Sequence, residues 1–367
     1  MIGGGPAGAA TALGLARRGL RAVVLERTDG GGNPVGECLA PSANPLLHRL
    51  GLWEPLLASG PLPSPGNRSA WGGDGRPADH PFVREPFGHG WHLDRPAFNR
   101  ALLAAAEAAG AEVRTRAEVV AVAREGDGWR VTARGPDGEA TLRAPVVVDA
   151  SGRRALVART AGEPVVAFDR LAAAVAIVPP GPDPSPDATT LVEADPGGWW
   201  YSALLPGGGL VVARFSDPDL LAAEAAWDPA GWPALLAAAP LTRDRLARHG
   251  GPLPGRAAVA AAGSACLHRA AGDGWLAVGD AAAAFDPLSS HGVASALASG
   301  DRAAEAIVRH LAGDRDALPG HARRTAEAFL RYLPQQGAAY AEVTRWPDAP
   351  FWARRRGEAP DPASARP

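Results

Sequence analysis

Hydrophobic positions at the two ends of the chain predict helices and buried strands in alternation. Residues 9–18 predict a helix, and the apolar run 21–26 that follows it predicts a buried strand. Two further runs, 145–148 and 274–280, also predict buried strands, and residues 293–311 predict a long helix. Short apolar strands that alternate with helices are typical of an α/β fold with a parallel sheet.

The middle of the chain has a different pattern. Residues 112–143 alternate apolar and polar positions around two turns that contain Asp-Gly, as in a β-meander. From about 165 to 254, short apolar runs are broken by Pro-rich and Gly-rich turns. Residues 190–193, 199–205 and 210–215 therefore predict consecutive antiparallel strands.

A glycine-rich turn opens the first predicted helix. Its glycines match the pattern GxGxxG, in which they allow a tight turn, the approach of a pyrophosphate and close packing of helix on strand. The predicted strand ends in Glu26, roughly twenty residues later, where a carboxylate can accept both ribose hydroxyls. The alternative is a glycine-rich loop without function. The residues predicted to contact a dinucleotide are Gly3, Gly5, Pro6, Ala7, Gly8, Glu26 and Arg27.

A Gly-Asp pair near the other end of the chain predicts the second half of an FAD site. Asp280 ends the run 274–280, where a carboxylate can accept a hydrogen bond from a ribityl hydroxyl. The loop that follows leads into helix 293–311, whose first amides can stabilise the negative charge of a reduced flavin. The residues predicted to contact FAD here are Gly279, Asp280, Pro287, Ser289, Gly292 and Val293.

Three residues are catalytic candidates, each with a structural alternative. His291 can transfer a proton at neutral pH, with Ser290 beside it, or can simply bond the backbone of its loop. Glu37 either faces the flavin or complements the dipole of a nearby helix.

Arg95 and Gly152 are candidates for further cofactor contacts. Arg95 begins a predicted helix that Asp94 caps, and it either pairs with a phosphate or the flavin edge or lies on a solvated face. Gly152 follows the strand 145–148, where the backbone can approach the cofactor. Asp149 in the same turn is either a turn former or a ligand.

Together these elements predict an α/β fold, α+β overall. It combines a Rossmann-like FAD-binding domain, an inserted antiparallel β-sheet domain for the substrate and a helical C-terminus. The predicted ranges are 1–60, 90–162 and 258–312 for the FAD-binding domain, 61–89 and 163–257 for the substrate domain, 313–353 for the C-terminal helical segment and 354–367 for a disordered tail.

Composition narrows the class of protein. A net charge of −2 does not favour binding to nucleic acid or to an anionic membrane surface. No apolar run reaches the length of a membrane span. Cys38 and Cys266 have no metal or redox spacing, so we expect buried thiols in a cytoplasmic protein and no metal site. All 37 basic residues are arginine.

Only Met1 and Ile2 precede the glycine-rich turn, where a buried strand is expected. We therefore expect either a start set too late or a fragment. A sheet without most of its central strand is expected to lose hydrogen bonds and core burial.

These motifs resemble the single-FAD monooxygenase and halogenase superfamily, which has the p-hydroxybenzoate-hydroxylase fold. The resemblance rests on residues 3–8, Glu26, the Asp-Ala-Ser-Gly at 149–152 and Gly279-Asp280. Three further segments are similar to the flavoproteins that mature tryptophylquinone cofactors, relatives of the flavin-dependent tryptophan halogenases. They are residues 198–206, 286–290 and 345–355. The resemblance covers nearly the whole chain, apart from the first strand and the tail after about 356.

The resemblance implies an FAD-dependent monooxygenase that acts through a flavin hydroperoxide. Its substrate would be an electron-rich aromatic, either a small molecule or a tryptophan within a peptide or protein. Electrons would come from NAD(P)H or from a separate flavin reductase. In related hydroxylases an Asp-Gly pair helps bind NADPH, and Ser151-Gly152 stands in its place here, which leaves direct use of NAD(P)H open.

Other activities of this superfamily give the alternatives. Halogenases need a lysine near the flavin, and this chain contains none. Their Trp-x-Trp-x-Ile-Pro signature also fails, because Ala203 stands three residues before Pro206. Halogenation is therefore disfavoured. A flavin-dependent reductase of the geranylgeranyl-reductase type and a non-catalytic FAD-binding protein remain as alternatives.

Overall fold

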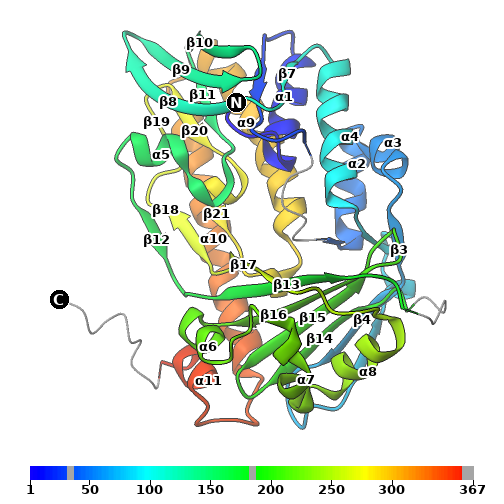
Figure 1. Cartoon of the computed structure of the whole chain (residues 1–367). Helices are drawn as coiled ribbons and strands as arrows, with labels where there is room; N and C mark the ends of the chain where they lie inside the picture. Colours follow the sequence, from blue (N-terminus) through cyan, green and yellow to red (C-terminus); the bar gives the residue numbers. More distant parts are fainter. Residues whose placement is uncertain (31–36, 182–186, 358–367) are drawn as a thin grey trace. The chain divides into compact units, whose positions relative to one another are not determined.

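The computed structural model describes residues 1–30, 37–181 and 187–357. The chain divides into two compact units, each built from three segments (Figure 1). Unit 1 comprises Met1–Pro61, Leu93–Phe168 and Ser264–Arg331, and unit 2 comprises Leu62–His92, Asp169–Gly263 and Tyr332–Pro367. That the first unit binds FAD and the second the substrate remains a prediction.

Unit 1 combines a parallel sheet with helices and a meander. Its helices are α1 (Pro6–Ala16), α2 (Asn44–Arg49), α3 (Trp53–Ala58), α4 (Arg95–Ala108), α5 (Leu156–Thr160), α9 (Gly292–Leu311) and the first part of α10 (Ala317–Ala341). Its strands are β1 (Val23–Leu25), β2 (Cys38–Leu39), β7 (Glu112–Arg114), β8 (Glu118–Glu125), β9 (Gly128–Gly135), β10 (Gly138–Ala144), β11 (Val147–Asp149), β12 (Val165–Ala167), β18 (Ala265–Leu267), β19 (Ala271–Gly272), β20 (Trp275–Ala277) and β21 (Ala283–Ala284).

The parallel sheet is arranged around Ile2. β1 pairs with β7, β11 pairs with β20, and both pairs are parallel. Ile2 joins them, because it bridges Leu25 on one side and Asp149 on the other. Its amide donates to the Val148 carbonyl and its carbonyl accepts from the Ala150 amide, each at 2.9 Å. The place of the expected central strand is therefore held by a single bridging residue.

The helix after the glycine-rich turn begins earlier than predicted. α1 starts at Pro6 because proline suits the first helical position, where its missing N–H costs nothing. Alanines line nearly every side of α1, and it lies against both α9 and α4 (Figure 1). Small side chains let these helix backbones approach closely, which explains the weak amphipathic pattern of this segment.

The predicted meander is confirmed as the antiparallel sheet β10-β9-β8. Alternate residues of β9, including Trp129 and Val131, are buried in the core of unit 1, and the residues between them are more exposed. The period of two seen in the sequence is thus the period of a sheet with one covered face.

Unit 2 is built on one large mixed sheet. The strand order is β17-β13-β16-β15-β14-β4-β5, and the predicted strands at 190–193, 199–205 and 210–215 are its members β14, β15 and β16. The strands of unit 2 are β3 (Leu62–Ser64), β4 (Gly66–Ala70), β5 (Ala78–Pro81), β6 (Gly90–His92), β13 (Ala172–Val178), β14 (Thr190–Asp195), β15 (Gly198–Leu204), β16 (Leu210–Ser216) and β17 (Ala258–Ala261). Its helices are α6 (Pro218–Ala223), α7 (Trp232–Leu235), α8 (Pro240–His249), the end of α10 and α11 (Pro350–Arg355).

Both faces of this sheet are covered, so two adjacent tryptophans on β15 are buried on opposite faces. Trp200 packs edge-on against Trp232 of α7, with ring centroids 5.2 Å apart. Trp199 points to the opposite face and stacks on Phe215 at 3.8 Å. Both are almost fully buried, so core is the role that the structure gives each of them.

Trp199 belongs to a group of rings that we call the aromatic cluster. Two of the similarity segments, 198–206 and 345–355, contribute Trp199 and Trp352, which both contact the ring of Trp71. The Trp199 indole N–H donates to the Tyr340 hydroxyl at 3.2 Å, and the Trp352 indole N–H donates to the Asp195 carbonyl at 2.8 Å. The members are Trp71, Trp199, Phe215, Tyr340, Phe351 and Trp352.

The end of the described chain is more ordered than predicted. Arg354 and Arg355 complete α11, and both pair with Asp217, at 2.9 and 3.0 Å. The predicted disordered tail therefore starts too early, and residues 358–367 lie outside the described residues.

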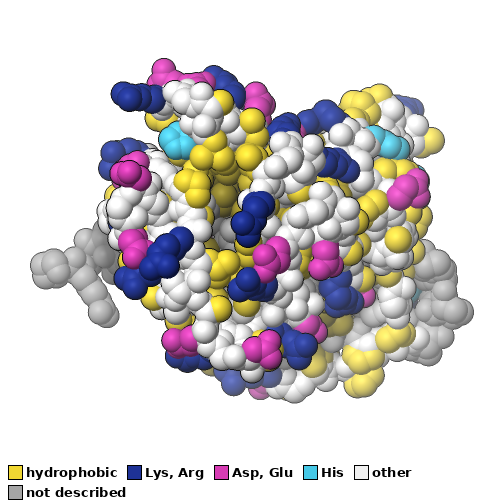
Figure 2. All heavy atoms as spheres, turned by 90° about the horizontal axis from the view of Figure 1, so that it is seen from above, with side chains coloured by type: hydrophobic (Ala, Val, Ile, Leu, Met, Phe, Trp, Pro, Cys, Tyr) yellow, Lys and Arg dark blue, Asp and Glu magenta, His cyan; other side chains and the backbone are white. Residues whose placement is uncertain are grey.

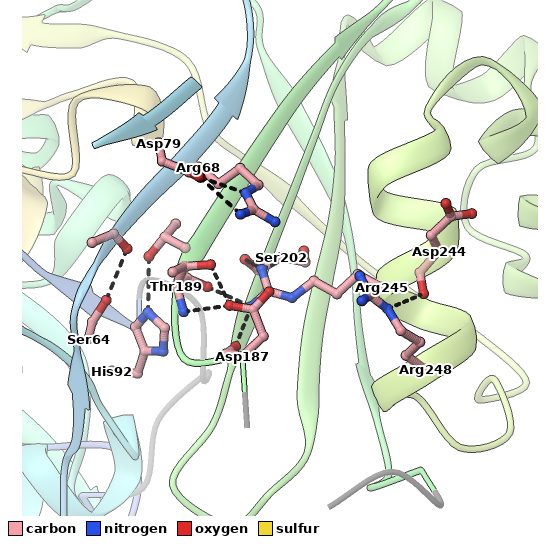
Figure 3. Close-up of polar contacts among 12 residues, drawn as sticks. Ser64, Arg68, Asp79, His92, Asp187, Thr189, Ser202, Asp244, Arg245 and Arg248 are labelled. Carbon is pink, nitrogen blue, oxygen red and sulfur yellow. Dashed lines mark hydrogen bonds and ion pairs between the residues drawn. The ribbon is translucent and has the colours of Figure 1, made fainter. Parts of the chain in front are cut away.

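A buried polar group ties the strands of unit 2 to α8 (Figure 3). Arg245 donates to the carbonyls of Asp187 and Thr189 at 2.6 Å and to the Ser202 carbonyl at 3.2 Å. His92, on β6, bonds the Thr190 hydroxyl at 3.0 Å and is completely buried. The contacts of His92 are thus those of a structural residue.

Two buried histidines predict a loss of stability in acid. Burial lowers the pKa of His92 in unit 2 and of His321 in unit 1 from 6.5 to about 4. As the pH falls through 6.5, the unfolded chain gains protons that the folded chain refuses until about pH 4. Each histidine should therefore remove up to about 3 kcal/mol of unfolding free energy across that window, measured by urea unfolding at several pH values.

Matched variants check this prediction. His321→Gln keeps a donor for the Ala277 carbonyl, which the imidazole contacts at 3.0 Å, but cannot titrate, so the slope should become shallower. His48→Gln, at an exposed position, should leave the slope unchanged. Equal slopes in the parent and His321→Gln would contradict the prediction.

Candidate functional site

A cavity of about 280 Å³ opens in unit 1 beside the glycine-rich turn. Five of the residues predicted from the sequence lie in its wall: Gly3, Gly5, Glu26, Arg27 and Gly152. They come from the turn before α1, the end of β1 and the turn after β11. On the face seen in Figure 2, apolar side chains gather in a central hollow, and acidic and basic side chains are mixed around it.

The three glycines of the fingerprint have different neighbours. A Cβ on Gly3 would lie 2.2 Å from the Ala150 carbonyl oxygen, and one on Gly8 would lie 2.1 Å from the Gly3 carbonyl oxygen. These two glycines are required by the fold itself. Gly5 has an ordinary backbone conformation, with φ −65°, and a Cβ there would meet no atom of the described residues within 4 Å. Its free space faces the cavity, as expected where a pyrophosphate approaches the backbone.

The amino end of α1 is also suited to an anion. Among the residues that the structure describes, no side chain caps it and no acidic residue lies in its first turn, so its amides at Ala7 and Gly8 have no capping acceptor there. The residues of the turn therefore fit the pyrophosphate of FAD. Pro6, Ala7 and Gly8 lie in this first turn, outside the wall of the cavity.

Glu26 fixes the turn from the end of β1. Its carboxylate accepts from the Gly4 amide at 2.7 Å and from the amide and hydroxyl of Thr28 at 2.9 and 2.7 Å. It lies in the cavity wall, so a ribose would meet a carboxylate already oriented by the backbone.

The sequence did not single out Asn99, which also lines this cavity. It is buried on α4, one turn after Arg95, and its Oδ1 has no hydrogen-bond partner among the described residues. The signal was present, because Asn99 is a polar residue between the buried positions Phe98 and Leu102 of an amphipathic helix.

Asp149, for which the sequence left open a turn-forming role or a ligand-binding role, is a turn former. Its carboxylate accepts from the amides of Val157 and Ala158 at the start of α5 and from the hydroxyl of Ser151 at 2.6 Å. It is fully buried, and these local donors occupy it.

Charges from three separate segments act on one another at the other end of the predicted site. Burial lowers the pKa of Arg95, and the carboxylates of Glu37 and Asp280 oppose that shift. Burial likewise raises the pKa of Asp280, opposed by Arg153, whose Nε lies 3.9 Å from the carboxylate, and by Arg95. The sequence candidates Glu37, Arg95 and Asp280 are thus brought together.

Asp280 lies beyond its strand rather than at its end. β20 stops at Ala277, and residues 279–281 form a short 3-10 turn that extends the chain past the sheet. The Gly279 amide donates to the Ser299 hydroxyl of α9 at 3.2 Å, which anchors this turn to the helix. The Asp280 side chain is 43% exposed, so its carboxylate remains reachable by a ligand.

The amino end of α9 is open. Among the described residues, His291 precedes Gly292 without a side-chain cap, the first turn holds no acidic residue, and a Cβ on Gly292 would meet no atom within 4 Å. The His291 amide donates to the Ser289 hydroxyl at 3.4 Å. The amides that follow it at the start of α9 fit the pyrimidine edge of a flavin, which becomes negative on reduction.

The loop before α9 is fixed by its own side chains. The Asp286 carboxylate accepts from the Leu288 amide and the Ser289 hydroxyl donates to the Asp286 carbonyl, both at 2.8 Å. Ser290 has the left-handed φ of 52°, which turns the chain toward His291. His291 is exposed, whereas its pKa is lowered by the surrounding protein. Pro287 is exposed, and Val293 is buried inside the helix start.

Comparison with known proteins agrees with this geometry. Residues 1–318 match the family model of the FAD binding domain. The chain belongs to this FAD-binding family. It is 31% identical over 360 residues to the putative FAD-dependent oxidoreductase LodB of Marinomonas mediterranea, an alignment that covers 97% of this chain and 95% of that protein.

This member of the FAD-binding family is also similar to solved structures of single-FAD monooxygenases and halogenases. The myxobacterial chondrochloren halogenase CndH matches with a TM-score of 0.85 at 28% identity, over 96% of this chain and 84% of that one. The peptidyl tryptophan dihydroxylase QhpG, essential for tryptophylquinone cofactor biogenesis, matches with a TM-score of 0.78 at 26% identity, over 97% and 77%. The predicted resemblance to single-FAD monooxygenases and halogenases is confirmed, and the chain is an FAD-dependent oxidoreductase.

Within the described residues, no group of three His, Cys, Asp or Glu side chains is arranged to hold a metal ion. No helix of the described chain is long and apolar enough to cross a bilayer. Neither Cys38 nor Cys266 forms a disulfide within the described residues. Cys38 is half-buried rather than buried as expected, whereas Cys266 is buried, which raises the pKa of its thiol to about 11.

Proposed function

We propose that this chain is a monooxygenase that hydroxylates an electron-rich aromatic ring, such as tryptophan in a peptide or protein. The observation that carries the proposal is the open amino end of α9 beside Asp280, which suits a flavin that cycles through its anionic reduced form. Similarity to a peptidyl tryptophan dihydroxylase along 97% of the chain supports the substrate class. The absence of lysine favours oxygen transfer over halogenation.

In this proposal the residues around the glycine-rich turn and those around Asp280 bind opposite ends of FAD. Glu26 accepts the ribose hydroxyls, the turn at Gly5 receives the pyrophosphate and Asp280 accepts from the ribityl chain. Reduced FAD supplies the two electrons that activate dioxygen for transfer to the ring. Arg95, whose charge is favoured by the carboxylates of Glu37 and Asp280, orients the cofactor edge as a charged donor.

In the loop before α9, His291 accepts a proton near the reacting ring. His291 has a pKa below its ordinary value, so its imidazole is neutral at pH 7 and can accept a proton. Ser290 holds the loop in its left-handed turn, and Glu37 faces the cofactor as a buried carboxylate.

The direct test is oxygen transfer by the purified, FAD-loaded protein. The flavin is reduced anaerobically and mixed with dioxygen, with and without a tryptophan-containing peptide, in a stopped-flow spectrometer. A transient absorbing species before reoxidation and a peptide mass increase of one oxygen atom would support the proposal. Immediate reoxidation with an unmodified peptide would contradict it, and a halogen in the product would show the other activity of the superfamily.

The electron donor is tested separately. NADH and NADPH are mixed anaerobically with the oxidised protein, and bleaching of the flavin is followed by absorbance. Bleaching of the flavin when no flavin reductase is added supports direct use of a nicotinamide. Bleaching only when a flavin reductase is added supports a separate partner.

A His291→Asn variant should lower the hydroxylation rate about a hundredfold at pH 7. In the parent the rate should fall as the pH drops through the lowered pKa of His291, because a protonated imidazole cannot accept a proton. That acidic limb should disappear from the pH–rate profile of the variant. His268→Asn, on an exposed side chain of unit 1, serves as the control and should keep the parent profile. An unchanged profile in His291→Asn would assign the residue to loop structure only.

A further inference from the structure

A second cavity of unit 1, about 220 Å³ in volume, lies between α9 and the first part of α10. Its wall includes the guanidinium-bearing Arg302 and the hydroxyl side chains of Ser295, Ser299 and Thr325. Gly279, Asp280 and Gly292, which the proposed function assigns to FAD, lie in the same wall. The proposed function gives no task to the rest of the wall, with Arg302, Ser295 and the residues of α10.

Arg302 is a half-buried cation without a bound counter-charge. It makes no hydrogen bond or ion pair with any residue that the structure describes, although arginines elsewhere in the chain commonly do. Burial lowers its pKa, and the positive charges of Arg324 and Arg49 lower it further. The favourable carboxylate, Asp301, is itself bound to Arg49 at 2.5 Å. The cation is therefore poorly compensated within the fold.

The acidic residue in the wall does not supply the missing charge. The Asp280 carboxylate lies 3.9 Å from Nε of Arg153, and no ion pair joins it to Arg302 among the described residues. The cavity thus has a positive end at Arg302, separate from the carboxylate.

The hydroxyl groups of the wall can add donors to this positive end. Ser299 accepts a hydrogen bond from the Gly279 amide at 3.2 Å, which leaves its own O–H free to donate. Thr325 donates to the His321 carbonyl at 3.0 Å and is already committed to its helix. Ser295 has no side-chain hydrogen bond among the described residues, so it too can donate.

We propose that this cavity is a binding site for the oxyanion group of a small phosphate-bearing or carboxylate-bearing molecule, held by Arg302 and the hydroxyls of Ser295 and Ser299. A planar guanidinium offers paired donors that match a carboxylate or phosphate, and binding removes the cost of an uncompensated buried cation. The volume of about 220 Å³ exceeds what one oxyanion fills, so the ligand extends beyond its charged group.

The site is tested by isothermal titration of sodium phosphate, sodium acetate and sodium chloride into the FAD-loaded protein. Loading with FAD occupies the predicted pyrophosphate site, and the flavin absorbance shows whether FAD stays bound. Saturable binding of phosphate or acetate without loss of FAD is expected. The phosphate and acetate titrations distinguish the two ligand classes.

Three variants locate the site. Arg302→Gln should raise the dissociation constant for phosphate or acetate about tenfold or more, because one charge-assisted pair is lost. Ala328→Leu should also weaken binding, since it fills the cavity while Arg302 keeps its charge. Arg309→Gln is the matched control on the same helix, where the arginine is exposed and paired with Asp314 at 2.6 Å, and it should bind as the parent does.

Several results would overturn the proposal. They are the absence of saturable phosphate or acetate binding at millimolar concentration, binding of chloride alone, displacement of FAD by the added anion, or parent-like binding in both Arg302→Gln and Ala328→Leu. The second variant keeps the test decisive if Arg302→Gln fails to fold.

Discussion

Gly5→Val should produce a folded protein that does not retain FAD. The valine Cβ would meet no atom of the part of the chain that the structure describes, and valine suits the φ of −65°, so the unfolding free energy should change by about 1 kcal/mol or less. The same side chain enters the space where the pyrophosphate approaches the turn. FAD affinity should therefore fall about 10- to 100-fold, measured by flavin fluorescence on titration of the apoprotein.

Gly8→Ala is the contrasting control at the next glycine of the fingerprint. Its Cβ would lie 2.1 Å from the Gly3 carbonyl oxygen, a backbone atom that cannot move without shifting the sheet. This variant should lose about 3 kcal/mol or more of unfolding free energy in urea, whether FAD is present or not. If Gly5→Val and Gly8→Ala lose stability equally, the free space at Gly5 is not a ligand site.

Asp280→Ala should be purified largely without flavin. The carboxylate is exposed enough to reach a ligand and lies 3.9 Å from Nε of Arg153, so its loss removes a charge-assisted acceptor for the ribityl chain. We expect FAD affinity to fall about 10- to 100-fold. The measurement is the ratio of flavin to protein absorbance after gel filtration.

Asp273→Ala controls for the loss of a carboxylate near β20. That side chain is 85% exposed and pairs with Arg124 at 2.5 Å, so its removal should leave full flavin occupancy. An Asp280→Ala protein that keeps full flavin occupancy would contradict the proposal that this residue binds the cofactor.

The sequence predicted elements best where side chains dictate backbone geometry. Glycine and proline marked the turn before α1, and alternation marked β9, because these signals act within a few residues. Asp280 was placed at a strand end, but the structure carries it one turn further, since the end of pairing depends on a neighbouring strand that the local sequence does not reveal.

Groups that meet only in the tertiary structure were harder to predict. Glu37, Arg95 and Asp280 were chosen one by one, and the sequence held no sign that they act on one another. Arg302 was missed for a related reason, because a charged residue on an amphipathic helix is ordinarily solvated, and only the packing of α10 shows that it is not.

The tryptophans of 198–206 and 345–355 show how a family signature can serve packing. These segments suggested a substrate class, yet Trp199 and Trp352 are buried in the aromatic cluster and their indole N–H groups are occupied. A sequence comparison records that such residues recur, and the packing shows what occupies them.

The aromatic cluster also gives the molecule a built-in optical probe. Rings stacked as closely as Trp199 and Phe215, 3.8 Å apart in a fixed asymmetric setting, give near-ultraviolet circular dichroism that vanishes when unit 2 unfolds. Flavin bound to unit 1 would absorb visible light and report on that unit alone. Following both wavelengths through one urea titration would show whether the two units melt as a single cooperative body or one after the other.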